Sequence, residues 1–591
     1  MSTQGRQSRR SHTTGRGSSY DEAPRTTRRG ASRDGSGAAP SNGPRTVLII
    51  FCAVFAVAVV RLIWLQVVQA PELAAAAKSN STNTITLSSK RGTIYDRNGN
   101  VLATSVDCET IYCNPHEVTD VSVTAQLLAA DLGGDASDYE KLLSKDTTFV
   151  YLKKKVDTSV ATQLTSDLSD AGINGVYELA DTKRIYPYGK CAGQVLGLVG
   201  SDGHGLTGLE LEYDDVLSGT DGEMVLETGA DGTPIAGGNS EVTAAKNGTD
   251  IVISIDVNIQ QTAEDEIEKA VKTYSASSGT VMATDPSTGE VLACCSTPLL
   301  DPSDTSSVTD EQLQLKPVSD SYEPGSMFKC LTMAIGIENG LISADTTFSV
   351  PSSVQVGTDN VTDDDGRDYT MSMSCREIMR RSSNTGAVIV GTSIGADVFS
   401  QGISAFGIGQ ATGIDYPGEV SGIVTQRSDY TGATLGSMSF GQGLAIPMDQ
   451  IVRAIGALAN KGVLTTPHFL LAKGEERVEW PSGSQACSAS TASQVVDMMK
   501  TVVSEGTGTN AQVNGLEIAG KTGTGEQADE NGGYKSGSFL ASFVGFAPAD
   551  DASVLIYVGL NDTPYLASES AAPTFSAIMS EASQDLSLST Q

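Results

Sequence analysis

Histidine is scarce in this sequence, with four residues in a chain of 591. Zinc sites need histidine and cysteine at characteristic spacings, and the nine cysteines match none of these spacings. We therefore expect neither a metal nor another cofactor. A Ser-His-Asp triad in the C-terminal half would have to use His468, the one histidine there, so another type of base is favoured for any serine nucleophile in that half.

Basic residues are also few, with 39 Lys and Arg against 71 Asp and Glu and a formal net charge of -32. Residues 1–45 are the exception, because they carry nine Arg, no Lys and three acids among many Ser, Thr and Gly. This segment has almost no large aliphatic side chain, cannot bury a core, and is expected to be a disordered tail. It lacks the aromatic interleaving of a nucleic-acid-binding segment, and we predict no nucleic-acid binding.

Residues 46–68, TVLIIFCAVFAVAVVRLIWLQVV, form a hydrophobic run long enough to cross a hydrocarbon layer of about 30 Å as one helix. Arginines precede the run and acids follow it, which predicts a cytoplasmic tail and an extracytoplasmic bulk. Arg61 lies past the middle of the run, where snorkelling explains a charge. A cleavable signal peptide is the alternative, because residues 74–77 are AAAA, but signal h-regions run only about 7 to 15 residues.

Two domains are expected after the anchor. Residues 69–245 contain strand-like runs such as TNTITL and GEMVLETG, with helical patterns near 121–132 and 158–171, which predict an α+β module. Residues 246–585 begin with DIVISI, a helical QQTAEDEIEKAVKTY and the strands GTVMATD and EVLACCS, and they end with SFLASFVGFA, SVLIYVGL and a helix near 573–582. Strands at both ends with helices between them predict one antiparallel sheet.

Three smaller features complete this organisation. The helices expected inside the second domain cover about 326–339, 375–398 and 448–460. The acidic stretch 357–369 does not fit the EF-hand template, and we expect a solvated surface loop there. Residues 586–591 form a polar tail. No internal repeat of 20 to 50 residues is visible in the sequence.

Ser326 and Lys329 form the one S-x-x-K in the chain, directly after Pro324 and Gly325, which predict a turn that opens a helix. Residues three apart on a helix lie side by side. A serine hydroxyl becomes a good nucleophile when a base takes its proton, and a lysine can do so when burial or another cation lowers its pKa. Lys329 is therefore the candidate base, although a surface Ser and Lys would give the same pattern.

Two further motifs follow in order, Ser382 and Asn384 as S-x-N in RRSSNTGAV, and Lys521, Thr522, Gly523 and Thr524 in AGKTGTGE. Alone, the first could be a helix cap and the second an edge strand. Together, S-x-x-K, S-x-N and K-T-G are the motifs of penicillin-binding proteins and serine β-lactamases. The stretches RGTIYDRNG (91–99), RIYPYG (184–189), GLTGLELEYDDVLSGTDG (205–222), DPSTGEVLA (285–293) and GIDYPGE (413–419) resemble class B penicillin-binding proteins.

This resemblance implies a fold in which an elongated α+β pedestal precedes a transpeptidase domain. It also implies roles for the motif residues. Ser326 would attack the penultimate D-alanine carbonyl of a stem peptide while Lys329 takes its proton, Ser382 would relay a proton to the leaving amine, and Asn384 would hold the substrate amide. Lys521, Thr522 and Thr524 would bind the terminal carboxylate, and Gly523 would let the strand approach the substrate. The Ser326 and Thr524 amides would form the oxyanion hole.

The function expected from these roles is a D,D-transpeptidase that β-lactams acylate. One rival is a β-lactamase or β-lactam sensor, although Glu419 in YPGE stands in no E-x-x-L-N motif and a hydrolytic glutamate is not evident. The other rival is an inactive scaffold. No glycosyltransferase domain fits before the second domain, so we expect a multi-spanning glycosyltransferase and division or sporulation wall-synthesis proteins as partners. The cysteines are expected to be free buried thiols, with a redox-sensitive Cys330–Cys375 pair as the alternative.

Overall fold

The computed structural model describes residues 43–70, 82–227, 240–481, 483–528 and 534–588. Most of the expected tail over 1–45, the alanines at 74–77 and the last three residues lie outside these ranges. The chain divides into two units, one of Met1–Thr82 with Gly229–Gly232 and one of Asn83–Thr228 with Thr233–Gln591.

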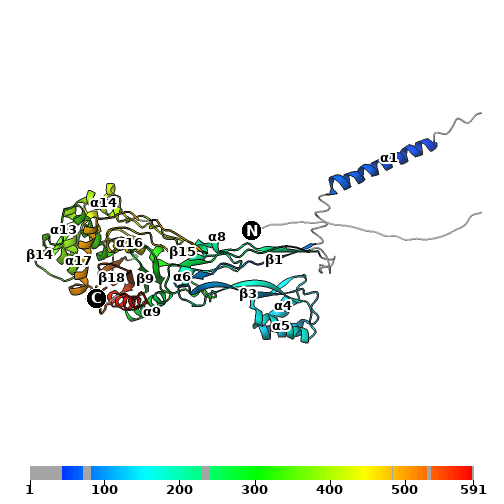
Figure 1. The fold of residues 1–591 in the computed structure, drawn as a ribbon, viewed down its shortest axis with the longest axis horizontal. Coiled ribbons are helices and arrows are strands. Elements are labelled where there is room, and N and C mark those ends of the chain that lie inside the picture. The colour runs from blue at the N-terminus through cyan, green and yellow to red at the C-terminus, as the bar shows by residue number, and fades with distance from the viewer. Residues whose placement is uncertain (1–42, 71–81, 228–239, 482, 529–533, 589–591) are drawn as a thin grey trace, which may run out of the picture. The chain divides into compact units, whose positions relative to one another are not determined.

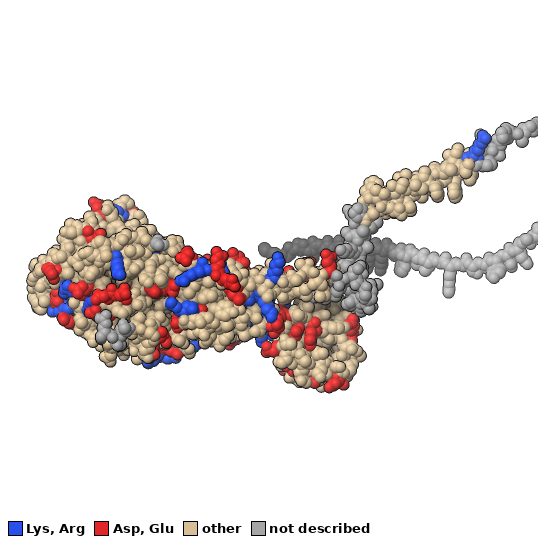
Figure 2. Space-filling view, in the orientation of Figure 1, with Lys and Arg blue, Asp and Glu red and all other residues tan. Residues whose placement is uncertain are grey.

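The first unit contains helix α1 (Gly43–Ile63), which continues as the π-helical turn η1 (Trp64–Val68). Within residues 45–68, an 18-residue window has a mean hydropathy of 2.8, and this helix is long and apolar enough to cross a membrane. Its surface is uncharged over most of its length in the view of Figure 2. The expected apolar helix is confirmed, and it begins three residues earlier than the sequence pattern indicated.

The N-terminal part of the second unit contains two sheets. The first, in the order β1-β6-β7, has three strands, and the second has seven strands in the order β16-β15-β8-β2-β3-β4, with β5 paired to β3. The strands of the first are β1 (Thr82–Leu87), β6 (Gly222–Glu227) and β7 (Ser240–Thr243). Those of the second are β2 (Ile94–Tyr95), β3 (Val101–Cys113), β4 (Val150–Asp157), β5 (Val176–Ile185), β8 (Ile251–Ile253), β15 (Leu470–Lys473) and β16 (Glu476–Arg477).

Three helices pack beside β3 and β4, and they confirm both helical patterns expected in this region (Figure 1). They are α3 (Val121–Leu132), α4 (Ala136–Leu143) and α5 (Thr158–Asp170). Asp120 caps the first of them by accepting hydrogen bonds from the Ser122 and Val123 amides. The short helices α6 (Gly193–Leu196), α7 (Gly208–Glu212) and α8 (Asp214–Leu217) follow.

The C-terminal part is built on the predicted antiparallel sheet, which joins strands from both ends of the segment in the order β10-β9-β19-β18-β17. Its strands are β9 (Ser278–Thr284), β10 (Val291–Ser296), β17 (Ala519–Ala528), β18 (Tyr534–Ala547) and β19 (Val554–Thr563). Helices α9 (Val257–Thr273) and α18 (Ala571–Asp585) pack on one face. The other face is covered by α16 (Met448–Ala459) and α17 (Ala489–Glu505), and α11 (Lys329–Glu338) packs on both of these helices. The α+β fold expected from the sequence is confirmed.

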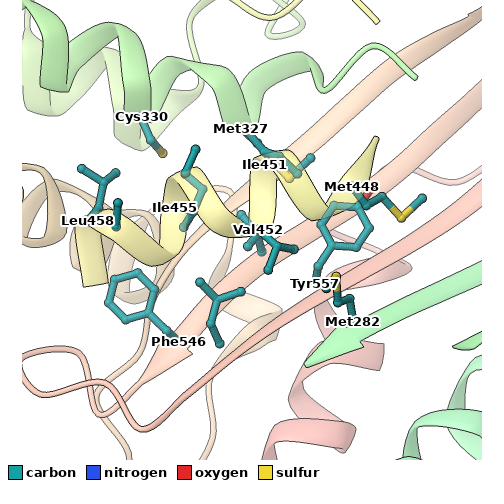
Figure 3. Packing of buried hydrophobic residues seen from close by; sticks show 14 of the residues in the cluster. Met282, Met327, Cys330, Met448, Ile451, Val452, Ile455, Leu458, Phe546 and Tyr557 are labelled. Atoms are coloured by element: carbon teal, nitrogen blue, oxygen red, sulfur yellow. The ribbon is translucent and has the colours of Figure 1, made fainter. Parts of the chain in front are cut away.

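Helix α16 lies between α11 and the strands of this sheet in the view of Figure 3. Ile451, Val452 and Ile455 point from the helix into a core to which the strands contribute Phe546 and Tyr557. Met327 and Cys330 close the core from the side of α11, and all of these side chains are buried. The neighbours of Ser326 are thus fixed by packing, because a close-packed interior resists displacement of its side chains.

The region between α11 and α16 is less regular than the sequence pattern suggested. Instead of one helix over 375–398, the structure has α12 (Cys375–Arg381), α13 (Asn384–Ile394) and α14 (Ala396–Ala405). The expected single helix is therefore wrong, because Ser382 takes a left-handed conformation with φ +59° and Ser383 begins a new helix by capping the Gly386 amide. Short elements complete the region: β11 (Thr347–Val350), β12 (Ser353–Val356), β13 (Asp359–Thr362), β14 (Met371–Ser374) and α15 (Thr434–Met438). Helix α10 (Lys316–Ser319) precedes α11.

Candidate active site

Ser326 lies in a short 3-10 turn, Gly325–Phe328, which leads directly into α11. Gly325 has φ +56°, which a glycine adopts at little cost, and its amide donates a hydrogen bond of 3.0 Å to the Gly441 carbonyl. A Cβ on Gly441 would stand 2.0 Å from the Gly325 oxygen. The turn is therefore held against a second glycine-rich turn by close backbone contact.

The side chain of Lys329 connects the first two motifs. Its Nζ lies 2.8 Å from Ser326 Oγ, 2.6 Å from the Ser382 carbonyl oxygen and 2.7 Å from Asn384 Oδ1. Lys329 is fully buried, whereas Ser326 is half-buried. The left-handed conformation of Ser382 brings both its carbonyl and its hydroxyl to the lysines, since Ser382 Oγ also lies 2.9 Å from Lys521 Nζ. The structure brings Ser326, Lys329, Ser382, Asn384 and Lys521 together in one cluster.

The K-T-G residues lie on β17, which is the edge strand of the five-stranded sheet. Lys521 is fully buried, and its Nζ also approaches the carbonyl oxygen (3.0 Å) and Oγ1 (3.1 Å) of Thr522. A Cβ on Gly523 would meet Ser542 Oγ at 2.5 Å and Met327 at 3.1 Å. Glycine is therefore required here for packing against the turn of Ser326, which is a reason that the motif alone did not reveal.

Both lysines have lowered pKa values. Burial, and then the positive charge of Lys521, hold the pKa of Lys329 well below its ordinary value. Burial lowers the pKa of Lys521 to about 8. A buried lysine beside a second cation has the properties of a general base at neutral pH. The site can therefore deprotonate a serine hydroxyl without a histidine or a metal.

Asp363 supports the S-x-N turn and was missed in the sequence. Its carboxylate accepts hydrogen bonds from Ser383 Oγ (2.7 Å), the Thr385 amide (2.9 Å) and Arg367 Nη2 (2.8 Å). Burial raises the pKa of Asp363, but these hydrogen bonds outweigh burial, and the pKa is lowered. The expected solvated loop over 357–369 is wrong at this point, because the side chains of Asp363 and Arg367 are only 6% and 3% exposed. The sequence feature that could have revealed this ion pair is the spacing of Asp363 and Arg367, which are four residues apart.

The side chains of the histidine and the cysteines considered in the sequence analysis make no hydrogen bond to the described residues of this cluster. His468 stacks on Trp480 with ring centroids 4.6 Å apart, and its Nδ1 lies 2.8 Å from the Thr466 carbonyl. All nine cysteines are free, and the eight beyond the span are buried, which confirms free buried thiols and contradicts a Cys330–Cys375 bond. Within the described ranges, no group of three or more His, Cys, Asp or Glu side chains could hold a metal ion.

Two family models match the chain. Residues 279–580 match the penicillin binding protein transpeptidase domain, and residues 86–253 match the penicillin-binding protein dimerisation domain. Penicillin-binding protein PbpB of Mycolicibacterium smegmatis is 32% identical, over 91% of this chain and 89% of that protein. Stage V sporulation protein D of Bacillus subtilis is 31% identical, over 87% of this chain and 81% of that protein.

More distant relatives agree with these matches. Peptidoglycan D,D-transpeptidase FtsI of Escherichia coli is 27% identical, over 90% of both chains. The crystal structure of penicillin-binding protein 2X from Streptococcus thermophilus superposes with a TM-score of 0.73 at 26% identity, over 85% of this chain and 80% of that one. The chain belongs to the class B penicillin-binding proteins of the division and sporulation type, and it is a peptidoglycan transpeptidase of cell-wall synthesis.

Proposed function

We propose that Ser326 is the nucleophile of this transpeptidase and Lys329 its general base. The Ser326 oxygen bonds to the penultimate D-alanine carbonyl of a stem peptide, its proton passes to Lys329, and the terminal D-alanine leaves with a proton relayed through Ser382. A second stem-peptide amine then attacks the acyl-enzyme, releases Ser326 and forms the cross-link. The observation that carries this proposal is the 2.8 Å separation of Ser326 Oγ and Lys329 Nζ.

The surroundings of Lys329 support a neutral amine before the reaction. The Ser382 carbonyl and Asn384 Oδ1 can only accept hydrogen bonds, and both lie within 2.7 Å of Nζ. A neutral amine has two N–H donors for these two acceptors and one lone pair, which remains for the hydroxyl proton of Ser326. These contacts accommodate the base form of Lys329, which the lowered pKa of its buried amine favours.

Substrate would add to the edge strand. An edge strand leaves backbone groups unpaired, and an extended peptide can pair with them. Lys521 supplies positive charge for the terminal carboxylate, Thr522 and Thr524 supply hydroxyl donors, and the Ser326 and Thr524 amides supply the oxyanion hole. The pedestal over 69–245 and the transpeptidase domain over 246–585 are proposed as the two extracytoplasmic domains, in accord with the family matches to 86–253 and 279–580.

The same site should retain a penicillin as a long-lived acyl-enzyme. Glu419, the acid of the YPGE stretch, accepts a hydrogen bond from Thr412 in its own loop, and both oxygens of Asp363 already accept hydrogen bonds. These two carboxylates are held by bonds within the protein, which favours slow deacylation over the water activation of a β-lactamase.

A labelling experiment tests this proposal. The purified chain is treated with a fluorescent penicillin and digested, and the labelled peptide is identified by mass spectrometry. We expect label on the peptide that contains Ser326, persistence over many minutes, and no label in Ser326→Ala. Label on another peptide, or label that disappears within seconds, would contradict the assignment.

The membrane arrangement is also proposed. The apolar helix α1 fits a single-pass membrane protein. The arginines before it support a cytoplasmic N-terminus and an extracytoplasmic catalytic domain by the positive-inside rule. A multi-spanning glycosyltransferase would supply glycan strands and contact this helix, with Arg61 as a candidate intramembrane contact. Replacing residues 46–68 with an unrelated span should abolish co-purification of that partner. Unchanged co-purification and function would refute the helix contact.

A further inference from the structure

Thr507 is the residue outside the three motifs that lies next to the carboxylate-binding hydroxyls. It follows α17 in the segment Gly506–Gly508, and its Oγ1 is 2.8 Å from Thr522 Oγ1. The two flanking glycines leave no room for side chains, since a Cβ on Gly506 would meet the Arg380 carbonyl oxygen at 2.5 Å and one on Gly508 would meet Phe543 at 3.2 Å. The Thr507 amide also donates to the Arg380 carbonyl, at 3.3 Å. The segment is thus fixed against the helix that leads to Ser382.

The donors of Lys521 are already occupied in this arrangement. An ammonium group has three N–H donors and no acceptor. The three nearest acceptors are Ser382 Oγ (2.9 Å), the Thr522 carbonyl (3.0 Å) and Thr522 Oγ1 (3.1 Å), all within the chain. Lys521 therefore presents charge to a substrate carboxylate, and the hydrogen-bond donor nearest to that charge is the hydroxyl of Thr522.

The direction of that hydroxyl proton depends on Thr507. A threonine hydroxyl has one proton and two lone pairs, and one lone pair of Thr522 accepts from Lys521. A carboxylate only accepts, so Thr522 can bind it only by donating its single proton outward. The second lone pair is then free to accept the proton of Thr507. If Thr522 donated to Thr507 instead, the single hydroxyl proton of Thr522 would not be available to the carboxylate.

We propose that Thr507 is a positioning residue for recognition of the substrate carboxylate, because it donates to Thr522 and directs the Thr522 hydroxyl proton to the ligand. This inference deepens the proposed function, on which it rests. Thr507 acts through Thr522 and need not touch the substrate. The role requires a hydroxyl at position 507, and serine should fulfil it while valine, which has the same shape, should not.

The test compares benzylpenicillin with its methyl ester, which lacks the carboxylate charge. Second-order acylation rate constants are measured on the purified full-length chain for wild type, Thr507→Val, Thr507→Ser and Thr507→Ala. We expect the acid-to-ester ratio to fall about three- to tenfold in the valine and alanine variants, the range for one net hydrogen bond, and to be restored in the serine variant. Thr509→Val, at an exposed threonine just after this segment, should keep the wild-type ratio.

A double-mutant cycle separates the role of Thr507 from a general structural effect. Thr507→Val should not lower the ratio further in a Thr522→Val background, since Thr507 acts through that hydroxyl. Equal losses for acid and ester, an unchanged ratio, or additive effects in the double variant would each overturn the inference. If wild-type Ser326 were not acylated at all, the proposed function itself would fail, so the two failures are distinguishable. The alanine and serine variants keep the test decisive if the valine variant does not fold.

Discussion

At the scale of single residues, the proposed mechanism needs the two lysines of the site in opposite protonation states. In this mechanism Lys329 is the neutral base, and its pKa is lowered by burial and by the charge of Lys521. Lys521 attracts a carboxylate only while it is charged, and burial lowers its pKa to about 8. The neutral fraction of Lys329 grows as pH rises through its pKa, whereas the charged fraction of Lys521 falls as pH rises through about 8.

Acylation should therefore show a bell-shaped pH dependence with an alkaline limb near pH 8. Lys521→Arg should move this limb to higher pH, because a guanidinium stays charged there. The measurement is the acylation rate constant for penicillin between pH 5 and about 10. Lys500→Arg, a lysine paired with Asp550 and Glu517 away from the site, is the matched control. An alkaline limb that stays in place in Lys521→Arg would show that another group titrates.

Asp363 gives a second residue-scale prediction. Asp363→Asn removes the charge that pairs with Arg367 and weakens the bonds to Ser383 and Thr385, so the turn carrying Ser382 should shift. A misplacement of about 1 Å can cost up to about a hundredfold in rate, and we expect acylation to slow by about ten- to a hundredfold. Asp368→Asn, at an exposed position of the same loop, should acylate normally. Wild-type acylation in Asp363→Asn would show that the turn needs no such support.

At the scale of elements, the position of Ser326 depends on two turns in backbone contact. Gly441 has φ +87°, and a Cβ there would collide with the Gly325 oxygen, whereas Gly418 has φ +89° and open space around it. Both Gly→Ala variants cost about 1–2 kcal/mol for the left-handed backbone. Only Gly441→Ala should also displace Ser326 and slow acylation by more than about tenfold. Similar acylation rates in the two variants, with similar thermal stability, would refute this coupling.

Several of these elements could be predicted from the sequence, and others could not. The antiparallel sheet, the helices at 121–132 and 158–170 and the three motifs were predictable, because periodicity and motif order are local properties of the sequence. The break at Ser382 was not, since a non-glycine residue with φ +59° is stable only when its surroundings hold it. Asp363 and Thr507 were missed for the same reason. Their roles depend on partners that lie 22 and 15 residues away in the sequence.

At the scale of the whole catalytic unit, three of the five family-like stretches outside the three motifs meet around one carboxylate. Glu210 is fully buried, and its oxygens lie 2.5 Å from Arg91 Nε and 2.7 Å from Arg184 Nε. These three residues come from GLTGLELEYDD, RGTIYDRNG and RIYPYG, and all three lie in the pedestal segment. Tyr213, also in GLTGLELEYDD, donates to Asp415 of GIDYPGE at 2.5 Å. Three of the stretches thus form an ionic cluster within the pedestal segment, and the Tyr213–Asp415 hydrogen bond links that segment to the transpeptidase segment.

The Glu210 cluster predicts an asymmetry between buried and exposed ion pairs. Glu210→Gln keeps the shape of the side chain but leaves the charges of Arg91 and Arg184 without this buried partner, and loss of one member of a buried pair costs about 3–5 kcal/mol. The exposed pair Lys141–Asp138, at 2.7 Å, should be worth less than about 1 kcal/mol, so Asp138→Asn is the control. The measurement is the midpoint of the first thermal transition of the purified chain. It should fall markedly for Glu210→Gln and hardly for Asp138→Asn, and equal small shifts would mean that packing alone stabilises this part of the pedestal segment.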